Sequence, residues 1–562
     1  MNSDRISQRQ IPVDEKKLDH IKQMVRLARY HFENGGANAS EVYYRMIIKE
    51  CTPPQNGIER VALGEAWVFF ARKNLYNHQN GAALDCYLKA IRADPYAVDY
   101  RVEYCIKVLI PMGMFKYARM EAERATRIEP NNSEAWRLLG GIEAQMMHVP
   151  ASIKAYDKQL ELDPGSPTAR LDRATVALDT ADYDTVRVMC EPVLKTERAA
   201  DAYHTLAMAL YREGKHEEAI EYYDKAIEGG CFDPDLATWN KSLALHAIGR
   251  YKEGWVAHEH RGQQTTDQGM ALVLKRFEAP RWSLEPPPAR LHVHQEMGHG
   301  DVIAMARYLP LLQEQGYDVT FEVNDSMVAL MQYSLPGVKV APRAIDYPGA
   351  MGIQAFDYHV PTLSLPYLME TTVETIPWRG AYLKANPGMA ASYEAKFEDH
   401  IKTRIGLVWS SGIRDEGLWL SQYGRKKSMP FKTLASAFWN VHDKYDFVSL
   451  QIGPERAEHQ GELIDVLPEQ PTWEQTAALV DRLDLVITVD TSVAHLAGAM
   501  GKPTIVMMQK DGASWHFMCE RKGAIWNDKS PWYPSTRIFR QKSPGDWSSV
   551  IDQIKMELEG SG

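Results

Sequence analysis

The sequence predicts an α-helical solenoid followed by an α/β region with two doubly wound, Rossmann-like halves. A helical pattern repeats through the first half of the chain, and short apolar strands alternate with helical segments in the second half. A proline-rich stretch, EAPRWSLEPPPAR, separates the two regions. We therefore expect a solenoid at 1–270, a linker at 271–290, a first α/β half at 291–395 and a second half with a C-terminal helix at 396–562.

The helical repeats have the same residues at fixed offsets. A tryptophan, a tyrosine and a closing proline coincide when the segment 64–95 is aligned with 133–164, and a third copy begins near residue 201. The pattern resembles the tetratricopeptide repeat (TPR), in which small residues let paired helices approach and a proline ends the second helix. Units near 17–54 and 167–199 are degenerate, so we expect roughly six or seven units.

A TPR array stacks into a superhelix whose concave face usually holds a peptide or protein. The sequence therefore predicts a protein partner for this region. The alternative is that the array only oligomerises the chain, so a homo-oligomer remains open at this point.

Composition and charge exclude several classes of function. The chain has 562 residues, 45% hydrophobic and 25% charged, and its net charge of −10 comes from mixed acidic and basic residues. Because no basic stripe is present, nucleic acid is not expected as a partner. We find neither a secretory signal pattern nor a run of about 18 apolar residues, so we expect a cytoplasmic protein without a transmembrane segment. The cysteines have no metal-ligand spacing and are expected to be reduced and buried: Cys51, Cys86, Cys105, Cys190, Cys231 and Cys519.

The stretch LVITVDTSVAHLAGAMGKP at 485–503 predicts a strand, a tight turn and a helix. Asp490 ends the strand, Thr491 and Ser492 are good helix caps, and His495 lies about one turn further on. A helix N-terminus with hydroxyl groups attracts anions, above all phosphates. An ordinary capped helix is the simpler interpretation. A Ser-His-Asp hydrolase is disfavoured because the G-x-S-x-G elbow is missing.

The α/β region begins with a strand that runs into a glycine turn, EMGHGD, at 296–301. Glycines permit a tight turn and the close approach of a ligand, and Asp301 stands at the helix start, facing the expected cleft. A dinucleotide site is disfavoured because Ile303 occupies the place of the third small residue of G-x-G-x-x-G. A simple N-cap role for Asp301 also remains open.

Further candidate donor contacts lie in the second half. A buried strand leads to Ser410 and Ser411, and the basic cluster that contains Lys427 follows. Hydroxyl, backbone and cationic groups of this kind suit a diphosphate, although the cluster alone is also typical of a solvated loop. Gln451 ends the next strand, where a nucleoside could be recognised.

An ordered set of motifs resembles the bacterial TPR-glycosyltransferases whose catalytic part is similar to the heptosyltransferases. The set is FEAPRW, EMGHGDVIAMARYLP, GLVWSSG, SLQIGP, LDLVITVDTSVAHLAGAMGKP and SPWYPSTRIFRQ. The resemblance as a whole begins with the final repeat, GRYKEGW, near residue 250 and continues to about the end of the chain. A more distant likeness is to the TPR-bearing O-GlcNAc transferases. Three features depart from the family's pattern: His299, Lys427 in place of arginine, and SWHF at 514–517.

The resemblance implies a metal-independent, inverting GT-B glycosyltransferase without a cofactor. It assigns Asp301 as the general base. It assigns the donor nucleotide sugar to Ser410, Ser411, Lys427, Gln451, Asp490, Thr491, Ser492 and His495. We expect the acceptor to be Ser or Thr of a protein docked by the TPR array, with flagellin as a candidate. The alternatives are a lipopolysaccharide or other glycan acceptor, and a non-catalytic TPR scaffold with a degenerate transferase domain.

Overall fold

The computed structural model describes residues 15–262, 277–343, 356–397, 401–412, 418–438, 440–510, 514–517, 520–521, 524–525 and 529–560. The chain forms two compact units that divide between Val176 and Ala177. The division falls within helix α9 (Pro167–Asp179), well inside the range predicted as solenoid. The last TPR helices therefore belong to the same unit as the α/β region.

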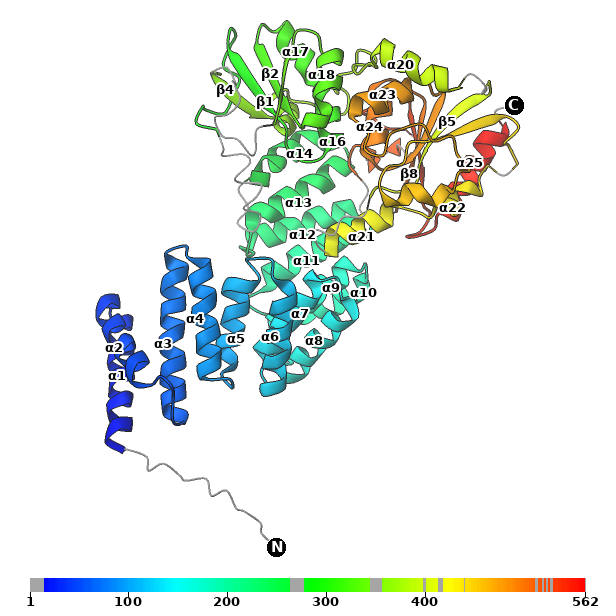
Figure 1. Ribbon diagram of the computed structural model, residues 1–562. Helices are drawn as coiled ribbons and strands as arrows, with labels where there is room; N and C mark the ends of the chain where they lie inside the picture. Colours follow the sequence, from blue (N-terminus) through cyan, green and yellow to red (C-terminus); the bar gives the residue numbers. More distant parts are fainter. Residues whose placement is uncertain are drawn as a thin grey trace. The chain divides into compact units, whose positions relative to one another are not determined.

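The first unit consists of antiparallel helix pairs that lie side by side (Figure 1). Its helices before α9 are α1 (Glu15–Glu33), α2 (Ala37–Glu50), α3 (Gly57–Tyr76), α4 (Asn80–Ala93), α5 (Val98–Tyr104) with the π-helix η1 (Cys105–Leu109), α6 (Phe115–Ile128), α7 (Ser133–Gln145) and α8 (Val149–Leu162). Pro95, Pro130 and Pro164 each lie two residues beyond a second helix, because proline cannot continue it.

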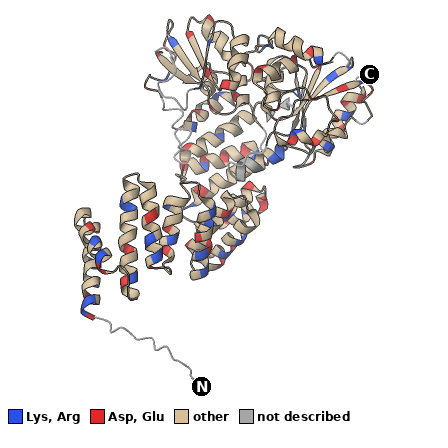
Figure 2. Cartoon of the chain, in the orientation of Figure 1, with Lys and Arg blue, Asp and Glu red and all other residues tan. Residues whose placement is uncertain are grey.

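Small residues set the spacing within this unit. A Cβ added at Gly140 of α7 would lie 2.9 Å from the Tyr156 ring of α8, and one at Gly64 would lie 2.6 Å from the Tyr100 ring. Glycine at these positions therefore lets a tyrosine pack directly on a helix backbone. Acidic and basic residues are mixed along the helices (Figure 2), as expected for a chain without a basic nucleic-acid stripe.

The second unit begins with TPR helices that pack on the α/β region. They are α10 (Tyr183–Val193), α11 (Ala199–Arg212), α12 (His216–Glu228), α13 (Pro234–Ala247), α14 (Tyr251–His258) and the 3-10 helix η2 (Glu259–Gly262). The indole of Trp255 on α14 donates to the Thr371 carbonyl at 3.0 Å, and the indole of Trp532 donates to the Tyr251 hydroxyl at 2.9 Å. Because Trp255 is buried in the same core as both sheets, α14 is part of the α/β fold.

The first sheet is parallel, with the order β3-β2-β1-β4. Its strands are β1 (Arg290–His294), β2 (Asp318–Val323), β3 (Lys339–Pro342) and β4 (Tyr358–Pro361). Its helices are α16 (His299–Met305), η3 (Ala306–Tyr308), α17 (Leu309–Glu314), η4 (Asp325–Met327), α18 (Val328–Ser334), η5 (Thr362–Ser364) and α19 (Leu365–Leu368). Its β1 lies directly before the glycine turn, where the sequence predicts a strand.

The second sheet is also parallel, with the order β11-β8-β7-β5-β6. Its strands are β5 (Thr403–Val408), β6 (Tyr445–Ser449), β7 (Leu485–Val489), β8 (Thr504–Met508) and β11 (Thr536–Arg540). Two short strands, β9 (Glu520–Arg521) and β10 (Ala524–Ile525), pair with each other in antiparallel orientation. The helices are α20 (Pro387–Glu394), η6 (Ala395–Phe397), α21 (Leu418–Lys427), α22 (Phe431–Ala435), η7 (Pro454–His459), α23 (Trp473–Asp481), α24 (Ser492–Ala499) and α25 (Ser548–Gly560).

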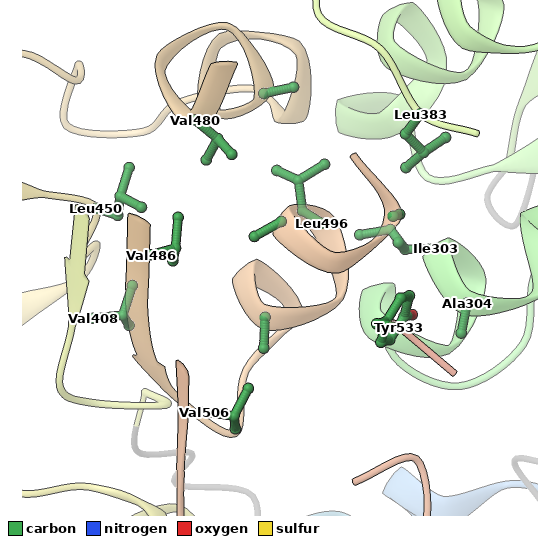
Figure 3. Close-up of a cluster of buried hydrophobic side chains, with 14 of the residues drawn as sticks. Ile303, Ala304, Leu383, Val408, Leu450, Val480, Val486, Leu496, Val506 and Tyr533 are labelled. Atoms are coloured by element: carbon green, nitrogen blue, oxygen red, sulfur yellow. The ribbon is translucent and has the colours of Figure 1, made fainter. Parts of the chain in front are cut away.

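The predicted fold class, a helical solenoid followed by two parallel α/β halves, is confirmed. The two halves meet where α16 faces α24, and Ile303, Leu383 and Leu496 are buried there side by side (Figure 3). Of the predicted linker, residues 271–276 lie outside the described residues, as does Cys519. The other five cysteines are free and buried. Among the described residues, no helix is long and apolar enough to cross a bilayer.

Candidate functional site

A cavity of about 450 Å³ lies beyond the carboxyl ends of three strands in the second unit. Residues after β1 form one side, and residues after β5 and β7 form another. Ligands of doubly wound sheets bind at this edge, and the volume is typical of a small-molecule site. The cavity brings together Asp301, Ser411, Lys427, Asp490, Thr491, Ser492 and His495.

Asp301 stands in the first turn of α16, where its Oδ2 accepts a hydrogen bond from the Gly298 N–H at 3.1 Å. Burial raises the pKa of this carboxyl group to about 6, helped by the nearby carboxylates of Glu296 and Asp490 and opposed by the Gly298 N–H and Lys427. A carboxylate with a pKa near neutrality is suited to accept a proton and release it again.

A buried ion pair fixes the glycine turn that precedes Asp301. The guanidinium of Arg261 donates to both carboxylate oxygens of Glu296, at 2.9 and 2.6 Å, and both side chains are fully buried. Glu296 also accepts from the Leu363 N–H at 2.9 Å. Because Arg261 lies in η2 at the end of the TPR helices, this contact links those helices to the turn that carries Asp301. The sequence analysis did not identify this pair.

Lys427 and Asp490 form an ion pair at 2.7 Å on the cavity wall, where both are largely buried. The Lys427 ammonium also lies 4.0 Å from the centre of the Tyr423 ring. Burial disfavours the charged ammonium, but Asp490 and Tyr423 outweigh it and raise the Lys427 pKa. Lys427 therefore stays charged at neutral pH.

The N-terminus of α24 opens on the cavity beside this pair. Thr491 is the N-cap residue, yet its side chain does not cap the helix and its hydroxyl instead lies 3.1 Å from that of Thr488. The first N–H groups of a helix have no partner within it. In α24 the Ala494 N–H bonds the Thr491 carbonyl at 3.0 Å, whereas the N–H groups of Ser492 and Val493 are not capped by the Thr491 side chain and can receive an anion from the cavity.

His495 lies at the contact between α16 and α24, where the two halves meet. Its Nδ1 is 2.9 Å from the Tyr533 hydroxyl, and a Cβ added at Gly300 would lie 2.7 Å from its ring. Burial is the main reason that the His495 pKa falls to about 4. His495 is therefore neutral at physiological pH and can act as a hydrogen-bonding group but not as a phosphate counter-charge.

The structure does not bring Ser410 and Gln451 into the cavity lining. Gln451 is buried, and its Oε1 accepts from the N–H groups of Trp409 and Ser410 at 3.1 and 2.9 Å. Its Nε2 donates to the carbonyls of Ser410 and Ile452. The Ser410 hydroxyl lies 3.1 Å from that of Ser428. These side chains hold the loop after β5 in place, which presents Ser411 to the cavity.

Several cavity residues were missed by the sequence analysis. Tyr211 comes from α11, and Trp239 and Leu243 come from α13, so TPR helices contribute to the cavity. Their repeat pattern carries no signal of such a role. Trp515 and His516 also line the cavity, and the only hint of them was that SWHF departs from the family's pattern.

Comparison with known proteins agrees with both parts of the chain. Residues 200–228 match the tetratricopeptide repeat, and residues 453–531 match glycosyltransferase family 9 (heptosyltransferase). Protein FlbA of Caulobacter vibrioides is 25% identical over 457 residues, which cover 76% of this chain and 67% of FlbA. The small glutamine-rich tetratricopeptide repeat-containing protein 2 of Mycosarcoma maydis is 33% identical over 95 residues, 17% of this chain and 26% of that protein.

Among solved structures, a tetratricopeptide repeat protein from Parabacteroides merdae matches 45% of this chain and 97% of its own, with 15% identity and a TM-score of 0.38. The family 9 match includes Asp490, Thr491, Ser492 and His495, whereas Asp301 and Lys427 lie before it.

Proposed function

We propose that the chain is a GT-B glycosyltransferase that transfers a sugar from a nucleotide-sugar donor to a protein hydroxyl with inversion. The matches to the tetratricopeptide repeat, to glycosyltransferase family 9 and to FlbA support a glycosyltransferase with a TPR region. The observation that carries the proposal is that Asp301, the Lys427–Asp490 pair and the N-terminus of α24 line one cavity. A base and an anion site are the two elements that such a transfer needs.

The donor phosphates would lie at the N-terminus of α24. There the helix dipole and the first N–H groups favour an anion, and the hydroxyls of Thr491 and Ser492 line the same wall. The Lys427 ammonium has three N–H donors, so it can hold a phosphate oxygen while it stays paired with Asp490. Ser411 completes this wall from the loop after β5.

Asp301 would act on the acceptor from the other half. In a single displacement the acceptor oxygen attacks the anomeric carbon, the bond from that carbon to the phosphate oxygen breaks, and the acceptor proton passes to the Asp301 carboxylate. Attack opposite the leaving phosphate inverts the anomeric centre. A positioned base of this kind typically contributes about 10²–10⁴-fold in rate.

A panel of nucleotide sugars tests donor binding. The protein is heated with UDP-, GDP-, ADP-, CMP- and dTDP-sugars, and binding to the folded state raises the melting temperature by mass action. We expect one nucleotide class to stabilise the protein. If none does at millimolar concentration, the protein is a scaffold and not a transferase.

We also propose that transfer requires no metal ion. The sequence's D-x-D pairs, Asp182/Asp184 and Asp233/Asp235, lie in TPR helices, where Asp182 accepts from the Thr185 N–H and Asp233 from the Leu236 N–H as helix caps. Transfer should therefore continue at an unchanged rate in excess EDTA. Loss of activity in EDTA that Mg²⁺ or Mn²⁺ restores would show that a metal holds the phosphates.

The acceptor is proposed to be Ser or Thr of a cytoplasmic protein docked by the TPR array, with flagellin as a candidate. A docking surface raises the local concentration of the modified segment at the cavity. A deletion that tests this docking role has to leave the second unit whole. A chain that begins at Glu278 would lack Trp255, which is buried in the core of the α/β region. Removal of residues 15–163 leaves that core intact.

Glycopeptide mass spectrometry of cells with this deletion tests the docking role. We expect donor binding to persist while Ser and Thr modification of the acceptor protein falls. Unchanged protein modification would exclude docking by the first unit, and a null strain altered only in its lipopolysaccharide would favour the glycan acceptor.

A further inference from the structure

Two TPR helices form a wall of the cavity instead of standing apart from it. Tyr211 of α11 and Trp239 and Leu243 of α13 line the same cavity as Asp301 and Asp490. Helix α13 is held in place by contacts with the rest of the second unit. His246 on α13 is fully buried, with its ring centroid 4.0 Å from that of Trp255 and 5.2 Å from that of Trp515.

Tyr211 lies close to the charged part of the cavity. Burial raises its pKa, and Tyr423 and Asp490 raise it further while Arg212 opposes them, so its hydroxyl is within electrostatic reach of the Lys427–Asp490 pair. The group stays protonated at neutral pH and can donate or accept a hydrogen bond.

Trp239 and His516 each have one buried ring nitrogen without a hydrogen-bond partner among the described residues. The indole Nε1 of Trp239 and the Nε2 of His516 are buried without a hydrogen-bond partner in the described part of the chain. His516 is 1% exposed, its Nδ1 lies 3.1 Å from the Ser514 hydroxyl, and its ring stacks on Trp515 with centroids 3.5 Å apart. Buried polar groups are normally paired, so unmet groups on a cavity wall point to a ligand with hydroxyl groups.

The chemistry of this wall suits a sugar ring better than a phosphate. Tyrosine and tryptophan offer a flat apolar face with a hydrogen-bonding group at one end. A sugar ring has the same mixture of C–H faces and hydroxyl groups. The wall residues Tyr211 and Trp239 carry no positive charge for a phosphate, which the N-terminus of α24 and Lys427 provide nearby.

We propose that Tyr211 and Trp239 contact the transferred sugar of the donor and determine which sugar the enzyme accepts. The inference rests on the proposed function and adds to it a role for the TPR helices inside the catalytic cavity. It implies that α11 and α13 serve sugar selection, whatever the first unit does.

The test measures how much the sugar contributes to donor binding. Calorimetry gives the dissociation constants of five pairs: UDP-N-acetylglucosamine with UDP, GDP-mannose with GDP, ADP-glucose with ADP, CMP-N-acetylneuraminate with CMP, and dTDP-glucose with dTDP. In the full chain, one sugar nucleotide should bind more tightly than its bare nucleotide, and the ratio of the two dissociation constants is the gain from the sugar. Tyr211→Phe and Trp239→Phe should each reduce that gain by up to about tenfold, since each removes one hydrogen bond, while affinity for the bare nucleotide stays unchanged.

Matched controls keep the test specific. Tyr203→Phe changes a tyrosine on the same helix, α11, whose ring packs on Tyr222 with centroids 5.7 Å apart. Trp136→Phe changes a tryptophan of α7 in the first unit. Both controls should retain the full gain. An unchanged gain in both Tyr211→Phe and Trp239→Phe, or an equal loss for sugar nucleotide and bare nucleotide, would overturn this inference alone. If the wild-type protein binds none of the pairs, the proposed function fails as well.

Discussion

At the residue scale, the site depends on how burial sets the charge of each group. Burial raises the Asp301 pKa to about 6, lowers the His495 pKa to about 4, and is outweighed at Lys427 by its partner Asp490. The cavity thus holds a base close to its titration point, a neutral imidazole and a permanent cation. Residue types in the sequence suggested these groups, but their protonation follows from burial, which the sequence does not reveal.

The Lys427–Asp490 pair can be tested by removing its charges one at a time. Lys427→Met leaves the Asp490 carboxylate buried without its partner, which should lower the free energy of unfolding by about 3–5 kcal/mol. The double variant Lys427→Met/Asp490→Asn should recover most of that stability, because no unpaired charge remains. Its donor affinity should stay low, since the phosphate contact is still missing. Urea unfolding and calorimetry measure the two quantities, and recovered donor affinity in the double variant would remove Lys427 from the phosphate site.

At the element scale, the strand–turn–helix units that begin with β1 and β7 could be predicted from the sequence. The direction of the side chains in the neighbouring loops could not. Apolar runs identified β1, β5, β6 and β7, and the turns after β1 and β7 identified Asp301 and Asp490. Gln451 looked equally well placed after β6, but its amide binds the backbone of the loop after β5. Which way a side chain points at a strand end depends on neighbouring strands, and sequence spacing does not encode it. Tyr211 and Trp239 lie far from the catalytic motifs in sequence, so only the fold brings them to the cavity.

Because α16 and α24 are in close contact, adding one methyl group at Gly300 should lower the stability of the protein. In Gly300→Ala the new Cβ would lie 2.7 Å from the His495 ring, so the helices must move apart or the ring must shift. We expect a loss of about 1–3 kcal/mol in the free energy of unfolding, together with weaker donor binding. In the control Gly81→Ala, no heavy atom lies within 4 Å of the added Cβ. Urea unfolding should show that control at least as stable as the wild type, because alanine at an open helical position stabilises the helix. Equal stability of Gly300→Ala and wild type would mean that the two helices are not in tight contact.

At the scale of the whole molecule, the chain divides inside the TPR array and not at its end. Sequence periodicity marks where repeats stop, but compactness depends on shared cores, and Tyr251 and Trp255 belong to the core of the α/β region. A buried cluster of histidine and tryptophan side chains joins α13 and α14 to that region. His246 and His258 come from these helices, and His516 from the SWHF segment.

These buried histidines predict acid sensitivity of the second unit. Burial lowers the His246 pKa from 6.5 to about 3, so the folded state keeps it neutral while the unfolded chain binds a proton below pH 6.5. Stability should therefore fall as the pH drops from 6.5 toward 3, by about 2 kcal/mol for His246 alone at pH 5 relative to pH 7.5. In His246→Leu this part of the pH dependence should vanish, whereas the exposed control His20→Leu should keep it. Urea unfolding at both pH values measures the difference, and identical pH dependence in His246→Leu and wild type would contradict the neutral, buried state.

The central claim is that Asp301 takes the acceptor proton while the donor is held elsewhere in the same cavity. Parallel measurement of turnover and donor dissociation constant in Asp301→Asn tests it most directly, with Asp325→Asn, an exposed aspartate at the start of η4, as the matched control. The account predicts that turnover falls by about 10²–10⁴-fold in Asp301→Asn while donor binding is unchanged, and that the control behaves as wild type. Wild-type turnover in a folded Asp301→Asn protein would contradict the account.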